Sequence, residues 1–358
     1  IAIGENAGQG TAPSSTGDNV GTDNIFLGTD SGRCITTACS NVFIGQYAGC
    51  KVTTGGCNVA LGYLALGDGV VTGDGNNVAI GFIAGKVVTS GEANVFIGER
   101  AGSAITTSSH NVFLGARAGQ YRQTGGRNIA LGHYALQGSS TAADNTGFYN
   151  IAFGAYAAKS VTSGGYNIFF GRNAGCLTTS GAGNIAMGCN ALSRQLTGNA
   201  NIAIGPQAGY NIGAGVCNVF IGRDAGESSG TATDNDASYN VAIGQGAGKG
   251  LTDGDGNVFL SQTAGQEVTT GDNNIAIGYD AGKKMGVGDE NISIGKGAGG
   301  QDGTAVDNDA SSNISIGAGT GRGLTDGDNN IFMGNSTGAC TTTGLANVMI
   351  GNYAGQCH

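Results

Sequence analysis

Residues 41–57 read NVFIGQYAGCKVTTGGC, and the chain repeats this 17-residue stretch with small changes along its whole length. Numbered from Asn41 as position 1, a repeat has Val or Ile at position 2 and Ile, Leu, Phe or Met at position 4. Position 5 is Gly, with Ser261 as the exception, and positions 8 and 9 are usually Ala and Gly. A Thr-rich stretch closes the unit. A fixed short period of this kind is typical of a solenoid.

An Asn opens 19 repeats, and most of these asparagines stand 17 residues apart. One spacing is 19, and those that begin at Asn128, Asn218 and Asn291 are 22. The extra residues enter after position 9, so we expect long loops in the coils beginning at residues 1, 128, 218 and 291. The repeat-opening residues are Asn24, Asn41, Asn58, Asn77, Asn94, Asn111, Asn128, Asn150, Asn167, Asn184, Asn201, Asn218, Asn240, Asn257, Asn274, Asn291, Asn313, Asn330 and Asn347.

The repeat predicts short strands and no helices. Val, Ile and Phe dominate positions 2–4, whereas a Gly every few residues disfavours a helix. Stacked coils of mostly 17 residues give an all-β fold, a parallel β-solenoid of about 20 coils. We expect residues 1–358 to form one continuous array. Because the sequence starts and stops inside a repeat without polar caps, it reads as a fragment of a longer chain or fibre.

The Asn at position 1 suits a coil corner. Its side-chain amide can donate to the neighbouring coil, so that the asparagines form a ladder. The alternative is a turn residue that tolerates an unusual φ, although Gly and Asp never replace it.

Position 3 should point away from positions 2 and 4, which we expect to fill the core. It is nevertheless apolar, and an apolar stripe along a solenoid must be covered. We therefore expect an interface stripe and a parallel homo-oligomer; the alternative is a flattened coil that buries both faces of its strand. The Phe residues of this stripe are Phe26, Phe43, Phe96, Phe113, Phe169, Phe220, Phe259 and Phe332.

The units NVAIG, NIAIG and NIAFG resemble the head repeats of trimeric autotransporter adhesins, which have an NSVAIG-like core. The longer form, NIALGHYAL…TGFYNIAFG, is similar to repeats of phage tail fibres and related bacterial fibre proteins. This resemblance covers essentially the whole chain. It implies an extracellular, trimeric stalk or head at a cell or virion surface, which reaches a host glycan or protein.

Nine cysteines suggest an oxidising, extracellular setting. Stacking puts Cys34 beside Cys50 and Cys39 beside Cys57, at close to the Cα spacing of a disulfide. Cys340 and Cys357 lie 17 residues apart at the same position, which favours bridges between coils. Bridges within a coil and buried free thiols are the alternatives.

Charge and composition disfavour several functions. The net charge of −9 and the lack of a basic run exclude a typical nucleic-acid interface. No apolar run is long enough to span a membrane. The three histidines recur beside no acid or nucleophile, so we expect no enzyme and no cofactor. Asp253, Asp255, Asp326 and Asp328 could bind calcium, but Asp-Gly turns explain them more simply.

These patterns predict a structural extracellular fibre, such as a tail fibre, an adhesin stalk or a surface filament. An ice-binding or glycan-binding solenoid is the alternative. Paired threonines such as Thr53 and Thr54 could order water, and the related long loops at 141–145, 231–238 and 304–311 could contact a glycan.

Overall fold

The computed structural model describes residues 1–10, 21–141, 145–229, 235–300 and 308–355. They form two compact units, Ile1–Ser180 and Gly181–His358. Strands are the only regular elements among these residues. The long loops expected in four coils fall largely outside the described ranges, as does Cys357.

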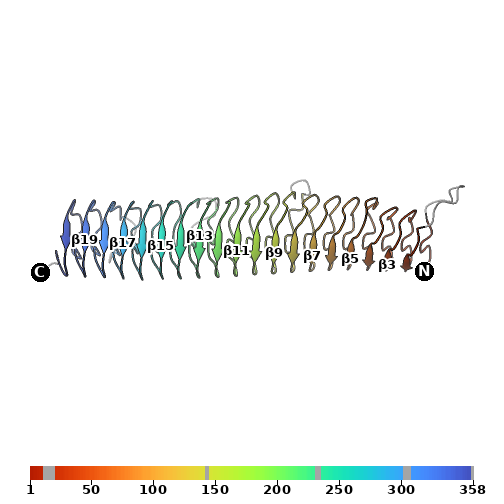
Figure 1. Ribbon diagram of the computed structural model, residues 1–358, viewed down its shortest axis with the longest axis horizontal. Coiled ribbons are helices and arrows are strands. Elements are labelled where there is room, and N and C mark those ends of the chain that lie inside the picture. Colours follow the sequence, from red (N-terminus) through yellow and green to blue (C-terminus); the bar gives the residue numbers. More distant parts are fainter. Residues whose placement is uncertain (11–20, 142–144, 230–234, 301–307, 356–358) are drawn as a thin grey trace. The chain divides into compact units, whose positions relative to one another are not determined.

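Each unit contains ten short strands, and each strand lies beside the next in chain order (Figure 1). In the first unit these are β1 (Ala2–Ile3), β2 (Ile25–Leu27), β3 (Val42–Ile44), β4 (Val59–Leu61), β5 (Val78–Ile80), β6 (Val95–Ile97), β7 (Val112–Leu114), β8 (Ile129–Leu131), β9 (Ile151–Phe153) and β10 (Ile168–Phe170). In the second they are β11 (Ile185–Met187), β12 (Ile202–Ile204), β13 (Val219–Ile221), β14 (Val241–Ile243), β15 (Val258–Leu260), β16 (Ile275–Ile277), β17 (Ile292–Ile294), β18 (Ile314–Ile316), β19 (Ile331–Met333) and β20 (Val348–Ile350).

The strands pair in parallel, and each repeat position lies on the same position of the next coil. Val42 pairs with Val59, and Val219 pairs with Val241 despite the 22-residue spacing there. The parallel β-solenoid is therefore confirmed, with about 18 turns of about 17 residues. The small difference from 20 arises because ten strands enclose nine complete turns in each unit.

The side chain at position 3 points into the coil, which corrects the predicted interface stripe. Phe26 is 5% exposed, and the other seven Phe residues at this position have no exposed surface. They are Phe43, Phe96, Phe113, Phe169, Phe220, Phe259 and Phe332. The prediction was wrong because alternation places positions 2 and 4 on one face and position 3 on the other, without saying which face is inside.

Residue size at position 3 is linked to residue size at position 9 in several coils. A Cβ added at Gly49 would lie 2.4 Å from the ring of Phe43, so the ring occupies the space that Gly leaves. Where position 3 is Ala60, position 9 is Leu66, and both are buried. Ala130 and Leu136 repeat this exchange. In these two coils position 9 supplies the bulk that position 3 lacks.

Positions 8 and 12 complete the interior, as in Ala118 and Ile105, which have no exposed surface. The chain turns out of each strand at position 5, where Gly115 has φ +134°. A Cβ at Gly115 would lie 2.6 Å from the carbonyl oxygen of Gly132 in the next coil. Only Gly fits this bend well, because an L side chain would meet the adjacent backbone.

Candidate functional site

The repeat-opening asparagines lie one above another inside each unit. From Asn41 to Asn167, each backbone N–H donates to Oδ1 of the preceding Asn at 2.8–3.1 Å. The Asn41 side-chain amide donates to the same Asn24 oxygen at 3.1 Å. The second unit repeats the arrangement from Asn184 to Asn347, beginning with Asn201 N–H to Asn184 Oδ1 at 2.9 Å. These asparagines have a structural role and are shielded from any ligand.

Cys34 and Cys50, like Cys39 and Cys57, stack on adjacent coils as expected but are not bridged. Cys34 N–H donates to Cys50 O at 3.0 Å, and Cys57 N–H donates to Cys39 O at 2.9 Å, so both pairs lie on adjacent coils. All four are nevertheless free thiols, which corrects the expected Cys34–Cys50 and Cys39–Cys57 disulfides. Backbone register alone does not bring the sulfur atoms together. The pairing of Cys340 with Cys357 lies outside the described residues.

Positions 2 and 4 form an outward apolar surface, which we call the sheet face. It comprises the first and last residues of β2–β10 in the first unit and of β11–β20 in the second, and every one of them is apolar. Ile97 is 37% exposed and Ile204 is 38% exposed. In the first unit the rings of Phe153 and Phe170 stack at 4.6 Å on this face. The outward apolar surface is therefore the opposite side of the strand from the predicted Phe stripe.

Hydroxyl groups line a second outward strip. At position 13, Thr36 Oγ1 donates to Thr53 O at 2.9 Å, so this hydroxyl is used by the solenoid itself. Four residues before each Asn, however, the first unit presents exposed hydroxyls on eight of its coils. These are Thr37, Thr54, Ser90, Thr107, Thr124, Thr146, Ser163 and Ser180.

The corresponding strip of the second unit is of mixed composition and includes Asp253 and Asp326, which are both exposed. Beside it, Asp255 N–H donates to Asp272 Oδ1 at 2.7 Å, and Asp272 N–H donates to Asp289 Oδ1 at 2.8 Å. These carboxylates therefore cap the backbone of the neighbouring coil. Among the described residues, no three His, Cys, Asp or Glu side chains converge as a metal site requires.

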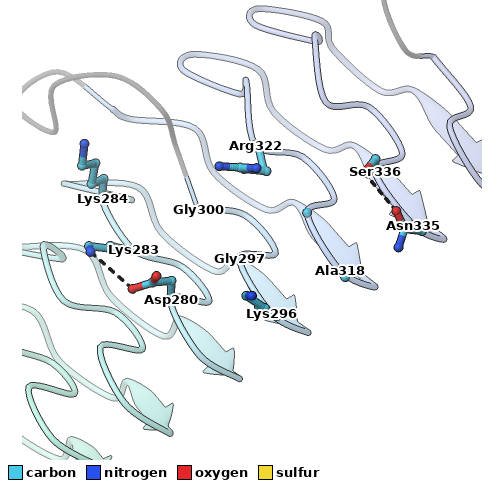
Figure 2. Close-up of a pocket in the computed structure, with 11 residues that line it drawn as sticks. Asp280, Lys283, Lys284, Lys296, Gly297, Gly300, Ala318, Arg322, Asn335 and Ser336 are labelled. Atoms are coloured by element: carbon cyan, nitrogen blue, oxygen red, sulfur yellow. Dashed lines mark hydrogen bonds and ion pairs between the residues drawn. The ribbon is translucent and has the colours of Figure 1, made fainter.

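A basic hollow lies on the second unit (Figure 2). Its volume is about 470 Å³, within the ~300–1,000 Å³ range of small-molecule sites. It crosses four successive coils at the corner that follows the strand. The side chains that line it are Asp280, Lys283, Lys284, Lys296, Arg322, Asn335 and Ser336.

Missing side chains create this hollow. Position 7 carries Tyr47, Tyr134 and Tyr156 in other coils, but Gly297 and Gly319 in two consecutive coils here. A Cβ added at Gly297 would meet nothing within 4 Å. Figure 2 shows bare backbone at Gly297 and Gly300, between Lys283 and Arg322.

Asp280 is the one carboxylate among the described residues that line the hollow, and it is already engaged. Lys283 Nζ lies 3.3 Å from Asp280 Oδ1, and Thr263 Oγ1 donates to the same oxygen at 2.7 Å. Burial opposes ionisation of Asp280, but the hydrogen bonds from Thr263 and Lys283 outweigh it and hold the carboxyl pKa below its ordinary value. Lys296 Nζ lies 5.8 Å from the centre of the exposed Tyr279 ring.

The hollow is lined by basic residues, whereas the unit that contains it is acidic. Residues 181–358 contain seven Lys or Arg and sixteen Asp or Glu, so this unit carries the whole net charge of −9. Four of those seven cations line the hollow. The sequence analysis did not predict the hollow, because the chain has no run of basic residues. The pattern that could have indicated it is the recurrence of Lys or Arg at positions 6, 10 and 11 of consecutive coils.

Comparison with known proteins adds no family assignment to the fold described above. No protein-family model matches the chain, and no curated protein was found to be related to it. In the described part of the chain, no helix has the length and apolar character that a membrane span needs.

Proposed function

We propose that this chain is a structural module of an extracellular fibre, such as an adhesin stalk, a tail fibre or a surface filament, and that it assembles through its sheet face. The observation that carries the proposal is the sheet face itself, which is apolar at every outward position of β2–β20 and half-buried or exposed there. The repeat resemblance supports the extracellular setting. No catalytic activity is proposed.

The occupant of the sheet face is a second copy of this chain. Coils spaced ~4.8 Å apart with strands ~10 Å long give a face of roughly 480 Å² for ten coils. Against the same unit of a second copy, each unit would then bury roughly 960 Å² in total, so the two units of a chain would bury roughly 1,900 Å². This matches a standard stable interface of ~1,200–2,000 Å². A flat, uniform surface of one chemistry is also complementary to itself.

The mass of the protein in solution tests this proposal. Light scattering after size exclusion should give a multiple of the 35.2 kDa chain mass, and the multiple distinguishes a dimer from the trimer that the resemblance implies. The double variant Ile97→Lys/Ile204→Lys places one charge on the sheet face of each unit and should be monomeric. Thr107→Lys/Thr270→Lys, at exposed positions off that face, should behave as the parent protein. A monomeric parent at high concentration would contradict the proposal.

Ice binding is a second candidate, favoured by the exposed hydroxyl strip of the first unit. Regularly spaced hydroxyls at coil spacing can order water along one side of the solenoid. Thermal hysteresis of the parent protein, lost in Thr107→Lys and kept in Ile97→Lys, would support this function. Absence of hysteresis in the parent protein would exclude it.

A further inference from the structure

The basic hollow of the second unit has the features of a ligand site, and none of them follows from fibre assembly. The sheet face uses positions 2 and 4, whereas the hollow uses positions 6, 7, 10 and 11 of the coils opened by Asn274, Asn291, Asn313 and Asn330. A solenoid could assemble equally well with a larger side chain at position 7, as the coils with Tyr, Arg, Asn or Gln there show. The loss of bulk in consecutive coils therefore needs a separate explanation.

We propose that this hollow binds an acidic oligosaccharide, a short carbohydrate chain that carries carboxylate or sulfate groups. Lys296 supplies an exposed ammonium that forms no ion pair among the described residues. Lys283 supplies a second ammonium next to Asp280, and the guanidinium of Arg322 lies across the bare glycine backbone from it (Figure 2). Ammonium and guanidinium groups are the usual protein partners of carboxylate and sulfate oxygens.

The carbohydrate part of the ligand is indicated by the uncharged groups around the cations. The Tyr279 ring is 45% exposed and stands directly beside Asp280, so it offers a flat amphipathic surface to a sugar ring. At the other end, Asn335 and Ser336 present an amide and a hydroxyl, joined by a hydrogen bond of 3.0 Å. Such groups can exchange hydrogen bonds with sugar hydroxyls.

The dimensions favour a short chain rather than a single ion. Four coils are separated by three spacings of ~4.8 Å, which gives a length of roughly 14 Å. An isolated sulfate or phosphate would occupy a small part of the ~470 Å³ volume. A ligand with several anionic groups can instead contact cations on successive coils.

The test uses the intact protein and titration calorimetry with tri-galacturonic acid, its neutral galactose counterpart and inorganic sulfate. The acidic trisaccharide should bind, with an affinity that falls as salt rises. The neutral trisaccharide and sulfate should each bind at least about tenfold more weakly. Lys296→Gln should weaken binding of the acidic trisaccharide about tenfold, since it removes a charge-assisted hydrogen bond. Arg194→Gln, which removes a cation over Tyr210 outside the hollow, should leave binding unchanged.

A second variant separates shape from charge. Gly297→Tyr fills the hollow, and the fold accommodates it because Tyr134 and Tyr156 occupy this position at φ 57° and 61°, close to the 62° of Gly297. It should abolish binding while lowering the melting temperature no more than Gly246→Tyr does. Gly246→Tyr makes the same substitution at φ 64°, where no hollow is present, and should bind normally.

Three results with the trisaccharides would overturn the proposal. These are equal binding of the neutral trisaccharide, full binding by Gly297→Tyr, and no binding of the acidic trisaccharide by the parent protein. Tighter binding of an oligonucleotide than of the trisaccharide would also reject it in favour of a phosphate-chain ligand. Because none of these measurements depends on oligomer mass, the fibre proposal stands or falls separately.

Discussion

Asn94 Oδ1 accepts two hydrogen bonds from Asn111, one from its backbone N–H at 2.9 Å and one from its side-chain amide at 3.1 Å. Asn111 Oδ1 in turn accepts the backbone N–H of Asn128 at 3.0 Å. One residue type thus satisfies a buried donor and a buried acceptor in every coil. This explains why neither Asp nor Gly replaces it, since Asp lacks the donor and Gly lacks both groups.

Asn111→Ala should destabilise the coils around it by about 2–5 kcal/mol, because it leaves the buried backbone N–H of Asn128 without its acceptor and removes one of the two hydrogen bonds to Asn94 Oδ1. Asn111→Asp should be at least as harmful, since a buried carboxylate would face Asn94 Oδ1. Hydrogen exchange across residues 94–130 measures the effect locally. Asn347→Ala, at a half-buried position, is the control and should change exchange much less.

The side of the strand that is inside can be tested with two adjacent residues. Phe113→Ala should cost about 3–5 kcal/mol because it empties the coil interior. Leu114→Ala, on the outward sheet face, should cost less than about 1 kcal/mol in dilute, monomeric protein. Thermal unfolding of both variants decides the question. Equal losses would mean that the interior assignment is wrong.

Substitutions at position 5 should change the stability of the protein in opposite directions at two sites. Gly115→Ala should destabilise the protein by at least about 1–3 kcal/mol, because φ is +134° and the added Cβ would contact Gly132 O. Ser261 occupies the same position at φ 116°, so Ser261→Gly should stabilise by about 1 kcal/mol. Melting temperatures of the two variants give the signs; a stabilising Gly115→Ala would contradict the steric argument.

Arg122 is fully buried, and desolvation lowers the pKa of its guanidinium to about 10. It reaches two coils ahead, donating to Val161 O at 3.0 Å and to Gly147 O. Arg122→Ala should therefore cost about 3–5 kcal/mol through a cavity and unpaired carbonyls. Arg122→Lys should not restore the lost stability, because a single ammonium cannot reproduce the planar arrangement of N–H donors on the guanidinium. Hydrogen exchange at residues 145–163 is the measurement.

Asp68 holds two lysines of neighbouring coils, with Lys51 Nζ at 2.6 Å and Lys86 Nζ at 3.3 Å. Hydrogen bonds from these lysines lower the pKa of its carboxyl. The resulting stability is present above the ordinary Asp pKa near ~3.9 and is lost as pH falls through the lower folded value. Because the groups are exposed, we expect less than about 1 kcal/mol between the parent and Asp68→Asn at pH 7. Thermal unfolding of the two proteins, measured at successively lower pH, should show this difference in stability disappear.

Much of the fold could be read from the repeat, because stacking forces each coil to place equivalent residues on equivalent residues. The Asn spacing predicted strand positions, parallel register and the insertion-tolerant side of the coil. It did not predict the inner face of the strand, although the exchange of Phe43 and Gly49 for Ala60 and Leu66 contained that information. Nor did it predict the state of Cys34 and Cys50, which depends on side-chain direction rather than register.

The sequence by itself determined that this chain is a parallel β-solenoid, because a short coil is stable only when identical coils satisfy one another's backbone and asparagine groups. Only the tertiary structure decided which apolar residues are buried and which face outward. It also decided that Lys283, Lys296 and Arg322, far apart in the chain, share one hollow. The physical reason is that periodicity specifies contacts between equivalent positions of neighbouring coils. Which side of a strand is buried, and where the surface is hollowed, depend instead on how non-equivalent side chains fill the space around the coil.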